Sequence, residues 1–131
     1  MSARFGNRKM LIPTVILVDE IMRRVKKGKL VAARQIRTKL ARDCGADVTC
    51  PLTTGIFMRI AAEAAEEDRL NGRKRITPYW RVVKDDGSLN PKFPGGVGQQ
   101  ARYLRSEGLG IARQRKRIFV KEFEKSLAVF K

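Results

Sequence analysis

The chain has 131 residues, a length that favours a single domain with its own hydrophobic core. Its 29 Lys and Arg residues outnumber 13 Asp and Glu residues, giving a formal net charge of +16. A positive field of this size attracts polyanions and repels other copies of the chain, so we expect a monomer whose partner is a nucleic acid. Because histidine is absent, the sequence excludes Ser-His-Asp and Cys-His catalysis, and we expect neither metal nor cofactor.

The cysteines and the apolar segments indicate the cellular compartment of the protein. Cys44 and Cys50 do not have CxxC spacing, so we expect reduced thiols in a cytoplasmic protein, with a disulfide between them as the alternative. The apolar stretch 10–18 is short and contains Pro13, which argues against a secretory signal and against a membrane partner. In a prokaryote we expect association with the nucleoid.

Apolar periodicity and capping residues predict three helices in the first half of the chain. Residues 1–11 are expected to be a basic arm. The helices are expected at about 14–27, 33–43 and from Thr53 or Thr54 to Arg69, with a short strand at 29–31. On the third helix we expect one face to be buried and the other exposed. The buried set is Ile56, Phe57, Ile60, Ala61, Ala64 and Ala65, and the exposed set is Met58, Arg59, Ala62, Glu63 and Glu66.

The second half is predicted to be a β-hairpin, a helix and a basic tail. Residues 78–83 are rich in β-formers, and Asp86-Gly87 is a hairpin turn signal. A fourth helix fits residues 97–107, and Val120, Phe123, Leu127 and Phe130 suit a short amphipathic helix. We therefore expect an α+β, mostly helical, winged helix-turn-helix domain at 12–108, followed by a C-terminal helical tail at 109–131.

Residues 69–83 carry a more specific signal. The string Arg69-Leu70-Asn71, followed by Pro78-Tyr79-Trp80-Arg81-Val82-Val83, resembles the active-site signature of O-6-alkylguanine-DNA alkyltransferases. In that family an asparagine hinge stands eight positions before the reactive cysteine of a Pro-Cys-His-Arg-Val motif, and Asn71 stands eight positions before Tyr79. The turn at 86–89, the Gly95-Gly96 loop and the ending Glu107-Gly108 follow in the family's order.

Two replacements change what the resemblance implies. Tyr79 stands at the position of the alkyl-accepting cysteine and Trp80 at that of the activating histidine. A phenol with a pKa of about 10 is a poor nucleophile beside a thiolate, so we expect no alkyl transfer and no enzyme. The pattern is similar to the alkyltransferase-like proteins, which bind alkylated guanine in DNA and pass it to nucleotide excision repair.

The resemblance implies a set of functional residues. Tyr79, Trp80, Arg81 and Asn71 are expected to form a pocket for a flipped base. The expected partners are double-stranded DNA, with alkylated guanine as the candidate lesion, and repair proteins. Aligned without gaps from Tyr79, Ala62 falls where the family has an arginine finger, so Arg59 is the candidate finger. The expected DNA contacts are Thr54, Met58, Arg59 and Ala62 on the third helix, Arg73, Lys74 and Arg75 after it, and Arg34 and Arg37 on the second helix.

Several alternatives stay open. The segment Tyr79–Arg81 would also suit a core-packing strand in which Trp80 is buried and Arg81 pairs with an acid. The protein could be a winged-helix DNA-binding protein without lesion specificity, with an architectural or regulatory role. It could also be a basic protein associated with RNA or the ribosome, which charge alone supports. The Arg113–Arg117 cluster is either a backbone contact or a flexible tail.

Overall fold

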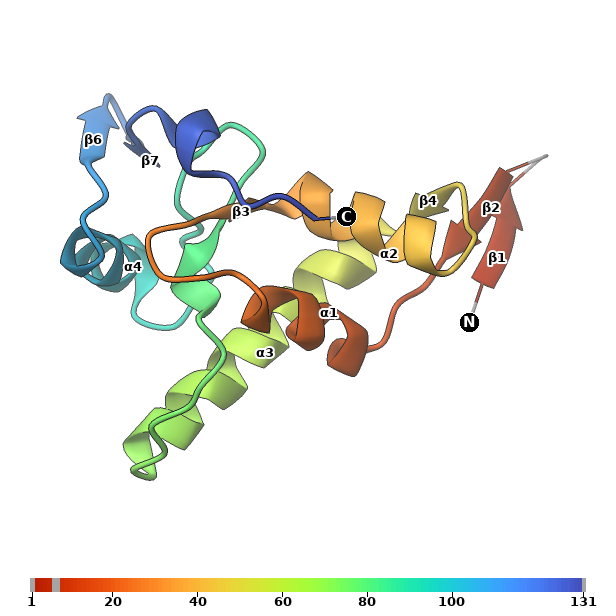
Figure 1. Ribbon diagram of the computed structural model, residues 1–131, viewed down its shortest axis with the longest axis horizontal. Coiled ribbons are helices and arrows are strands. Elements are labelled where there is room, and N and C mark those ends of the chain that lie inside the picture. Colours follow the sequence, from red (N-terminus) through yellow and green to blue (C-terminus); the bar gives the residue numbers. More distant parts are fainter. Residues whose placement is uncertain (1, 6–7, 131) are drawn as a thin grey trace.

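In the part of the chain that the structure describes, four α-helices form the body of the protein (Figure 1). Two of the three small sheets lie at its edges, and the third, a buried pair of short strands, lies inside. The structure is a computed structural model and describes residues 2–5 and 8–130. The helices are α1 (Val15–Arg23), α2 (Ala33–Asp43), α3 (Pro51–Leu70) and α4 (Gly96–Ser106). The expected α+β, mostly helical class is confirmed.

The first two helices follow from local sequence. The Thr14 hydroxyl oxygen accepts a hydrogen bond from the Leu17 N–H at 3.3 Å and so caps the start of α1. α2 has the predicted bounds, and the backbone N–H of Ala32, the residue just before the helix, donates to Gln35 Oε1 at 2.8 Å. α1 ends at Arg23, one turn before the predicted residue Lys27.

Helix α3 packs on the core with a face that only partly agrees with the one its periodicity predicts. Ala61 and Ala65 are buried as expected, but Met58 and Ala62 are buried as well, whereas Ile56 and Ile60 are 45% and 41% exposed. Apolar residues occur on more than one side of this helix, so their spacing does not distinguish one side. α1 and the 3-10 turn η1 (Tyr79–Arg81) pack on the Met58 side and decide which face is covered.

The predicted hairpin after residue 81 is replaced by a different pairing. Strand β5 (Val82–Val83) pairs in parallel with β3 (Val31–Ala32), and both strands are buried. Lys84 N–H donates to the Ser88 carbonyl at 2.9 Å and closes a tight turn. Ser88 then forms a bridge to Phe119, so the return strand of the predicted hairpin pairs with the C-terminal segment instead.

Both terminal segments are more regular than the sequence predicts. Strands β1 (Ser2–Phe5) and β2 (Arg8–Leu11), in the expected arm, are antiparallel, and β2 pairs in parallel with β4 (Val48–Thr49). The expected C-terminal helix is wrong. The segment instead forms β6 (Ile111–Gln114), β7 (Arg117–Val120) and the 3-10 turn η2 (Phe123–Ser126).

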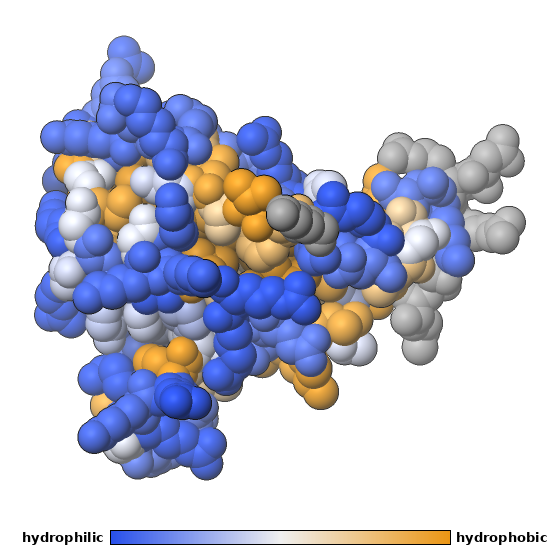
Figure 2. Space-filling model, viewed as in Figure 1, coloured by the Kyte–Doolittle hydropathy of each residue, from blue (hydrophilic) through white to orange (hydrophobic). Residues whose placement is uncertain are grey.

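The C-terminal segment nevertheless packs against the domain, as predicted. Leu30 N–H donates to the Ser126 carbonyl at 2.8 Å, and Ala128 N–H donates to the Leu30 carbonyl at 2.7 Å. Figure 2 shows hydrophilic residues over most of the face drawn, with a hydrophobic area in the middle near the C-terminus. Within the described residues, none of the helices combines the length and apolar character needed to span a membrane.

Candidate nucleic-acid interface

Tyr79, at the position of the family's cysteine, lies in the core. Its side chain has no exposed surface, and the rings of Phe93 and Tyr103 contact it edge-on. Its hydroxyl donates to Glu66 Oε2 at 3.0 Å and accepts from Gln99 Nε2 at 2.9 Å. The predicted open pocket beside Tyr79 is therefore wrong, because packed rings and satisfied hydrogen bonds occupy that space.

The surroundings of Tyr79 also determine its protonation. Burial raises the pKa of Tyr79 well above its ordinary value, the Gln99 hydrogen bond opposes this, and the Glu66 carboxylate raises it further. For Glu66, burial works toward a higher pKa, but hydrogen bonds from Arg69 and Tyr79 outweigh it, so the pKa is lowered. A neutral phenol beside an ionised carboxylate is the stable state, and it is not a nucleophile.

The side chains of Trp80 and Arg81 donate hydrogen bonds to a buried carboxylate instead of lining a base pocket. Glu107 Oε2 accepts from Trp80 Nε1 at 2.8 Å and from Arg81 Nη2 at 2.7 Å. Glu107 Oε1 accepts from the Gly28 N–H at 3.1 Å, and the Trp80 ring stacks on Tyr103 with centroids 4.5 Å apart. The alternative that Arg81 pairs with an acid is confirmed, and the expected role of both residues in an open pocket is wrong.

Asn71 lies just past the C-terminal end of α3, beyond Glu66, the residue of α3 that Tyr79 contacts. It is exposed and ends the helix, and its N–H donates to the Glu67 and Asp68 carbonyls at 3.0 and 3.2 Å. Figure 1 shows this end of α3 projecting from the body. Asn71 therefore links α3 to the exposed basic segment Arg73–Arg75, and its predicted place in a pocket with Tyr79 is wrong.

The predicted DNA contacts on α3 divide into buried and exposed residues. Thr54, Met58 and Ala62 are at most 5% exposed, so their expected contact with DNA is wrong because they pack in the core. Arg59 is exposed and lies 3.5 Å from Glu63, one turn further along. Of this set only Arg59 is available to a ligand.

The exposed side of the first half of α3 forms one wall of a groove. We call it the α3 groove, and its volume is about 280 Å³. Leu52 and Ile56 are 74% and 45% exposed there, although both are large and apolar. The other wall comes from the turn after β5 and the loop that follows it. The lining residues are Pro51, Leu52, Gly55, Ile56, Arg59, Lys84, Asn90, Pro91 and Lys92.

A buried amide positions the loop side of this groove. Gln100, on α4, has no exposed surface, and its Nε2 donates to the Trp80 and Val82 carbonyls at 3.0 and 2.8 Å. Its Oε1 accepts from the Asn90 N–H at 3.0 Å. Asn90 Oδ1 in turn accepts from the Lys92 N–H at 3.0 Å. Gln100 therefore holds β5 and the groove loop at a fixed separation.

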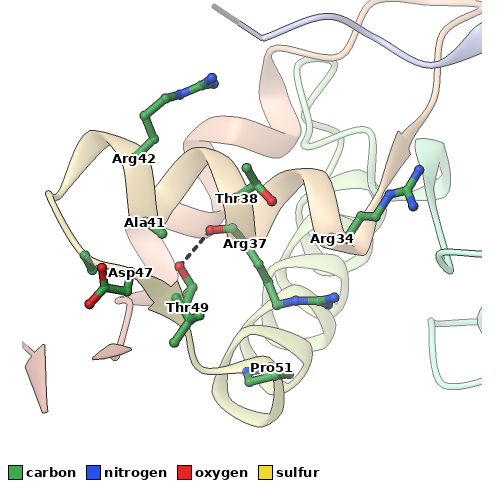
Figure 3. Close-up of a pocket in the computed structure, with 10 residues that line it drawn as sticks. Arg34, Arg37, Thr38, Ala41, Arg42, Asp47, Thr49 and Pro51 are labelled. Atoms are coloured by element: carbon green, nitrogen blue, oxygen red, sulfur yellow. Dashed lines mark hydrogen bonds between the residues drawn. The ribbon is translucent and has the colours of Figure 1, made fainter. Parts of the chain in front are cut away.

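A second hollow, of about 510 Å³, adjoins the α3 groove (Figure 3). Arg34 and Arg37 extend from α2 along it, and Pro51 lines both this hollow and the α3 groove. The Arg42 side chain, at the rim, points away from Pro51, and its Nη2 donates to the Phe130 carbonyl at 3.2 Å. Arg37 Nη2 lies 3.2 Å from Asp85 Oδ2, and Asp85 Oδ1 accepts from the Arg34 N–H at 2.8 Å. The Asp85 carboxylate is thus directed at the start of α2.

The two adjoining hollows define a surface that we call the basic track. Its cations are Arg34, Arg37, Arg42, Arg59, Lys84 and Lys92, and Asp47 is the acid that lines it. A hollow on the α1 side of α3 has a different character, because Asp19, Asp68 and Arg23 line it. Positive charge is therefore concentrated where α2, the start of α3 and the loop after β5 meet.

Sequence reasoning missed several of these residues for identifiable reasons. Gln100 falls in the buried register of α4, between Val97 and Leu104, and a polar residue there signals a buried hydrogen-bond role. Glu66 and Glu107 are acids that become buried only through tertiary packing. Leu52 and Ile56 carried no signal, because an apolar residue on a helix ordinarily indicates a core position.

The two cysteines are both free. Cys44 is exposed and Cys50 is half-buried just before α3, so the disulfide alternative is not formed. The Thr53 hydroxyl donates to Cys50 Sγ at 3.3 Å, and this bond is the main cause of a lowered Cys50 pKa. Among the described residues, no group of three or more acids and cysteines is placed to hold a metal ion.

Comparison with known proteins identifies the fold. No family model and no curated protein sequence matches the chain. Two solved structures do: S. pombe Atl1 in complex with damaged DNA containing O6-carboxymethylguanine, and S. pombe ATL in complex with DNA. Their TM-scores are 0.59 and 0.61 and their identities 17% and 16%, and each match covers 88% of this chain and 94% of the other. The chain therefore has the fold of S. pombe Atl1, an alkyltransferase-like protein.

Proposed function

We propose that the protein is a non-catalytic DNA-binding protein that recognises alkylated guanine in duplex DNA. The observation that carries this proposal is the basic track, in which three cations line the apolar α3 groove and three more line the adjoining hollow, on a fold that Atl1 uses in a complex with damaged DNA. Lys and Arg side chains that neutralise phosphates supply most of the affinity for DNA. The net charge of +16 adds long-range attraction.

The absence of alkyl transfer follows from the state of Tyr79. Its proton is committed to Glu66 and its oxygen already accepts from Gln99. The raised pKa keeps the phenol neutral, and the ring has no exposed surface at which an alkyl group could arrive. A lesion would therefore be bound and left unchanged, which suits a protein that marks damage for repair proteins.

The α3 groove is the proposed site for the lesion. Alkylation of guanine O6 adds an apolar group to a polar base edge, and Leu52, Ile56 and Pro91 offer apolar contact for such a group. Arg59, Lys84 and Lys92 are placed around them to hold the flanking phosphates. Receiving a base there requires it to leave the stack, at a cost of a few kcal/mol that is lower for a damaged base pair.

A second candidate function is DNA binding without lesion specificity. The complete burial of Tyr79 favours it, because the position that receives chemistry in the alkyltransferases has no opening here. In that case the basic track alone would bind the phosphate backbone, and the α3 groove would contact any sequence. This function and lesion recognition use the same surface. They differ in the ratio of the affinities for a duplex with alkylated guanine and for the unmodified duplex.

The deciding experiment is a fluorescence anisotropy titration of two matched duplexes, one with O6-methylguanine and one with guanine, at two salt concentrations. The proposal expects tighter binding of the modified duplex at both, and mass spectrometry that finds the methyl group on the DNA and none on Cys44 or Cys50. Equal affinities would leave the lesion-blind function. A structured RNA that displaces both duplexes at equimolar concentration would overturn DNA as the partner.

Two pairs of variants locate the site. Ile56→Ser should reduce the preference for the modified duplex, whereas Ile16→Ser, at another exposed isoleucine, should not. Arg59→Gln and Lys92→Gln should each lower the slope of log affinity against log salt by about 1. Arg105→Gln, at an exposed cation on α4, is the matched control and should leave that slope unchanged.

A further inference from the structure

The tip of the β6–β7 hairpin is an exposed group of cations that the basic track does not include. Arg113, Arg115, Lys116 and Arg117 are all exposed there. Arg117 Nη1 lies 3.7 Å from Asp86 Oδ2, and its guanidinium lies over the Phe119 ring at 4.5 Å. Within the described part of the chain, Arg115 and Lys116 have no ion pair. Their charges are therefore available to an external anion.

Backbone hydrogen bonds fix the hairpin against the turn that follows β5. Leu89 N–H donates to the Ile118 carbonyl at 2.9 Å, and Val120 N–H donates to the Gly87 carbonyl at 3.0 Å. Ser88 and Phe119 form an antiparallel bridge between these bonds. Figure 1 shows the hairpin beside the loop after β5. The hairpin is thus the strand pair that completes this edge of the domain.

The same register brings the hairpin tip to the α3 groove. Antiparallel pairing of Phe119 with Ser88 runs Arg117 toward Asn90 and the tip toward Pro91 and Lys92. A hollow of about 740 Å³ lies there, lined by Arg115, Lys116 and Arg117. It shares Lys84 and Pro91 with the α3 groove. The cations of the hairpin therefore continue the basic track past the groove.

The backbone conformation at the hairpin tip is one in which an arginine is unusual. Arg115 is the first residue of the two-residue turn between β6 and β7, and its φ is 58°. Glycine is ordinarily favoured at a positive φ in such turns, because a side chain there is strained. An arginine in this position places a cation at the outermost point of the hairpin in spite of that strain.

We infer that the β6–β7 hairpin is a second DNA contact, a wing that binds the phosphate backbone beside the segment held in the α3 groove. The inference rests on the proposed function and extends it to a part of the chain outside the resemblance. The hairpin pairs with the turn at Lys84–Ser88 and carries its cations beyond that turn along the same side of the domain. Arg115 and Lys116 contact phosphates without reading the base sequence.

The test compares Arg115→Gly with Glu122→Gly. Glu122 has a φ of 51°, so both substitutions relieve the same kind of backbone strain, but only the first removes a cation. Both variants should melt at or above the temperature of the unchanged protein. Arg115→Gly should lower the slope of log affinity against log salt by about 1, because each phosphate contact loses roughly threefold in affinity per fourfold rise in salt. It should also weaken binding of the modified and the unmodified duplex alike. Glu122→Gly should lower neither affinity nor slope.

The outcomes separate this inference from the function on which it rests. If the unchanged protein does not bind duplex DNA, the proposed function fails and the inference with it. If the unchanged protein binds, while Arg115→Gly and the double variant Arg115→Gly, Lys116→Gln keep its affinity and slope, only the wing is overturned. An equal loss in Lys26→Gln, at an exposed cation that lines none of the three hollows, would also overturn it.

Discussion

The hydroxyl of Tyr79 donates to a carboxylate oxygen of Glu66 at 3.0 Å and so joins the 3-10 turn η1 to the C-terminal part of α3. Arg69, one turn further along α3, holds the other oxygen of the same carboxylate at 2.7 Å. Together with Gln99 on α4, this network ties three elements around the Tyr79 hydroxyl. Tyr79 thereby stabilises the fold.

Tyr79→Phe should therefore lower stability without lowering DNA affinity. The variant leaves Glu66 and Gln99 without a buried partner, which costs about 1–3 kcal/mol of unfolding free energy. Urea unfolding measures the loss, with Tyr103→Phe as the control, since Tyr103 contributes its ring to the same cluster. A changed ratio of affinities for modified and unmodified duplexes would show that a base does reach Tyr79.

Glu107→Ala should be among the most destabilising single changes. The carboxylate is 6% exposed and accepts hydrogen bonds from Trp80, from the Gly28 N–H and from Arg81. The Arg81 side chain is itself only 13% exposed. Its removal leaves a buried guanidinium unpaired, at a cost of about 3–5 kcal/mol. Lys125→Ala breaks an exposed pair with Glu122 and should cost at most about 1 kcal/mol. Similar urea midpoints for the two variants would contradict this account.

Stability should fall in acid through the two buried carboxylates. Burial opposes ionisation of Glu66 and Glu107, but their hydrogen bonds outweigh it and lower both pKa values. Such a group contributes its full stabilisation above the unfolded pKa of about 4.3 and loses it as pH falls toward the folded value. The unfolding free energy should therefore be level from neutral pH to about 5 and decrease below about 4.

The measurement for this pH dependence is the urea midpoint across that range. Glu107→Gln removes one titrating group and should give a shallower decrease in acid. Glu124→Gln, at an exposed acid in η2, should keep the full decrease. A Glu107→Gln protein that loses stability in acid as steeply as the unchanged protein would show that this carboxylate is not a source of the effect.

The face of α3 that packs in the core is testable by a pair of truncations. Met58 is 5% exposed, so Met58→Ala should cost about 2–5 kcal/mol through lost burial and a cavity. Ile56 is 45% exposed, and Ile56→Ala should cost at most about 1 kcal/mol. Thermal unfolding distinguishes the two, and the reverse order would restore the face that periodicity predicts.

Local sequence signals placed most of the helices. Glycines and an apolar stripe predicted α2 with its bounds and α4 with its bounds to within one residue. The Pro78–Val83 string and Asn71 indicated the fold that the comparison with S. pombe Atl1 identifies. The net charge by itself favours a polyanion as partner. These features depend on residue types and on residues close together in the sequence, so they can be predicted from the sequence alone.

Other features depended on contacts between distant residues. Which side of α3 is buried was decided by α1 and Tyr79, since apolar residues occur on more than one side of the helix. Whether Arg81 would be free was decided by Glu107, 26 positions later in the chain. The C-terminal segment became a hairpin because Gly87 and Leu89 offered backbone partners for its strands. The amino-acid sequence by itself determined most of the helices and the charge, while only the tertiary structure decided which side chains remain exposed, because burial is a property of packed surfaces and not of any one segment.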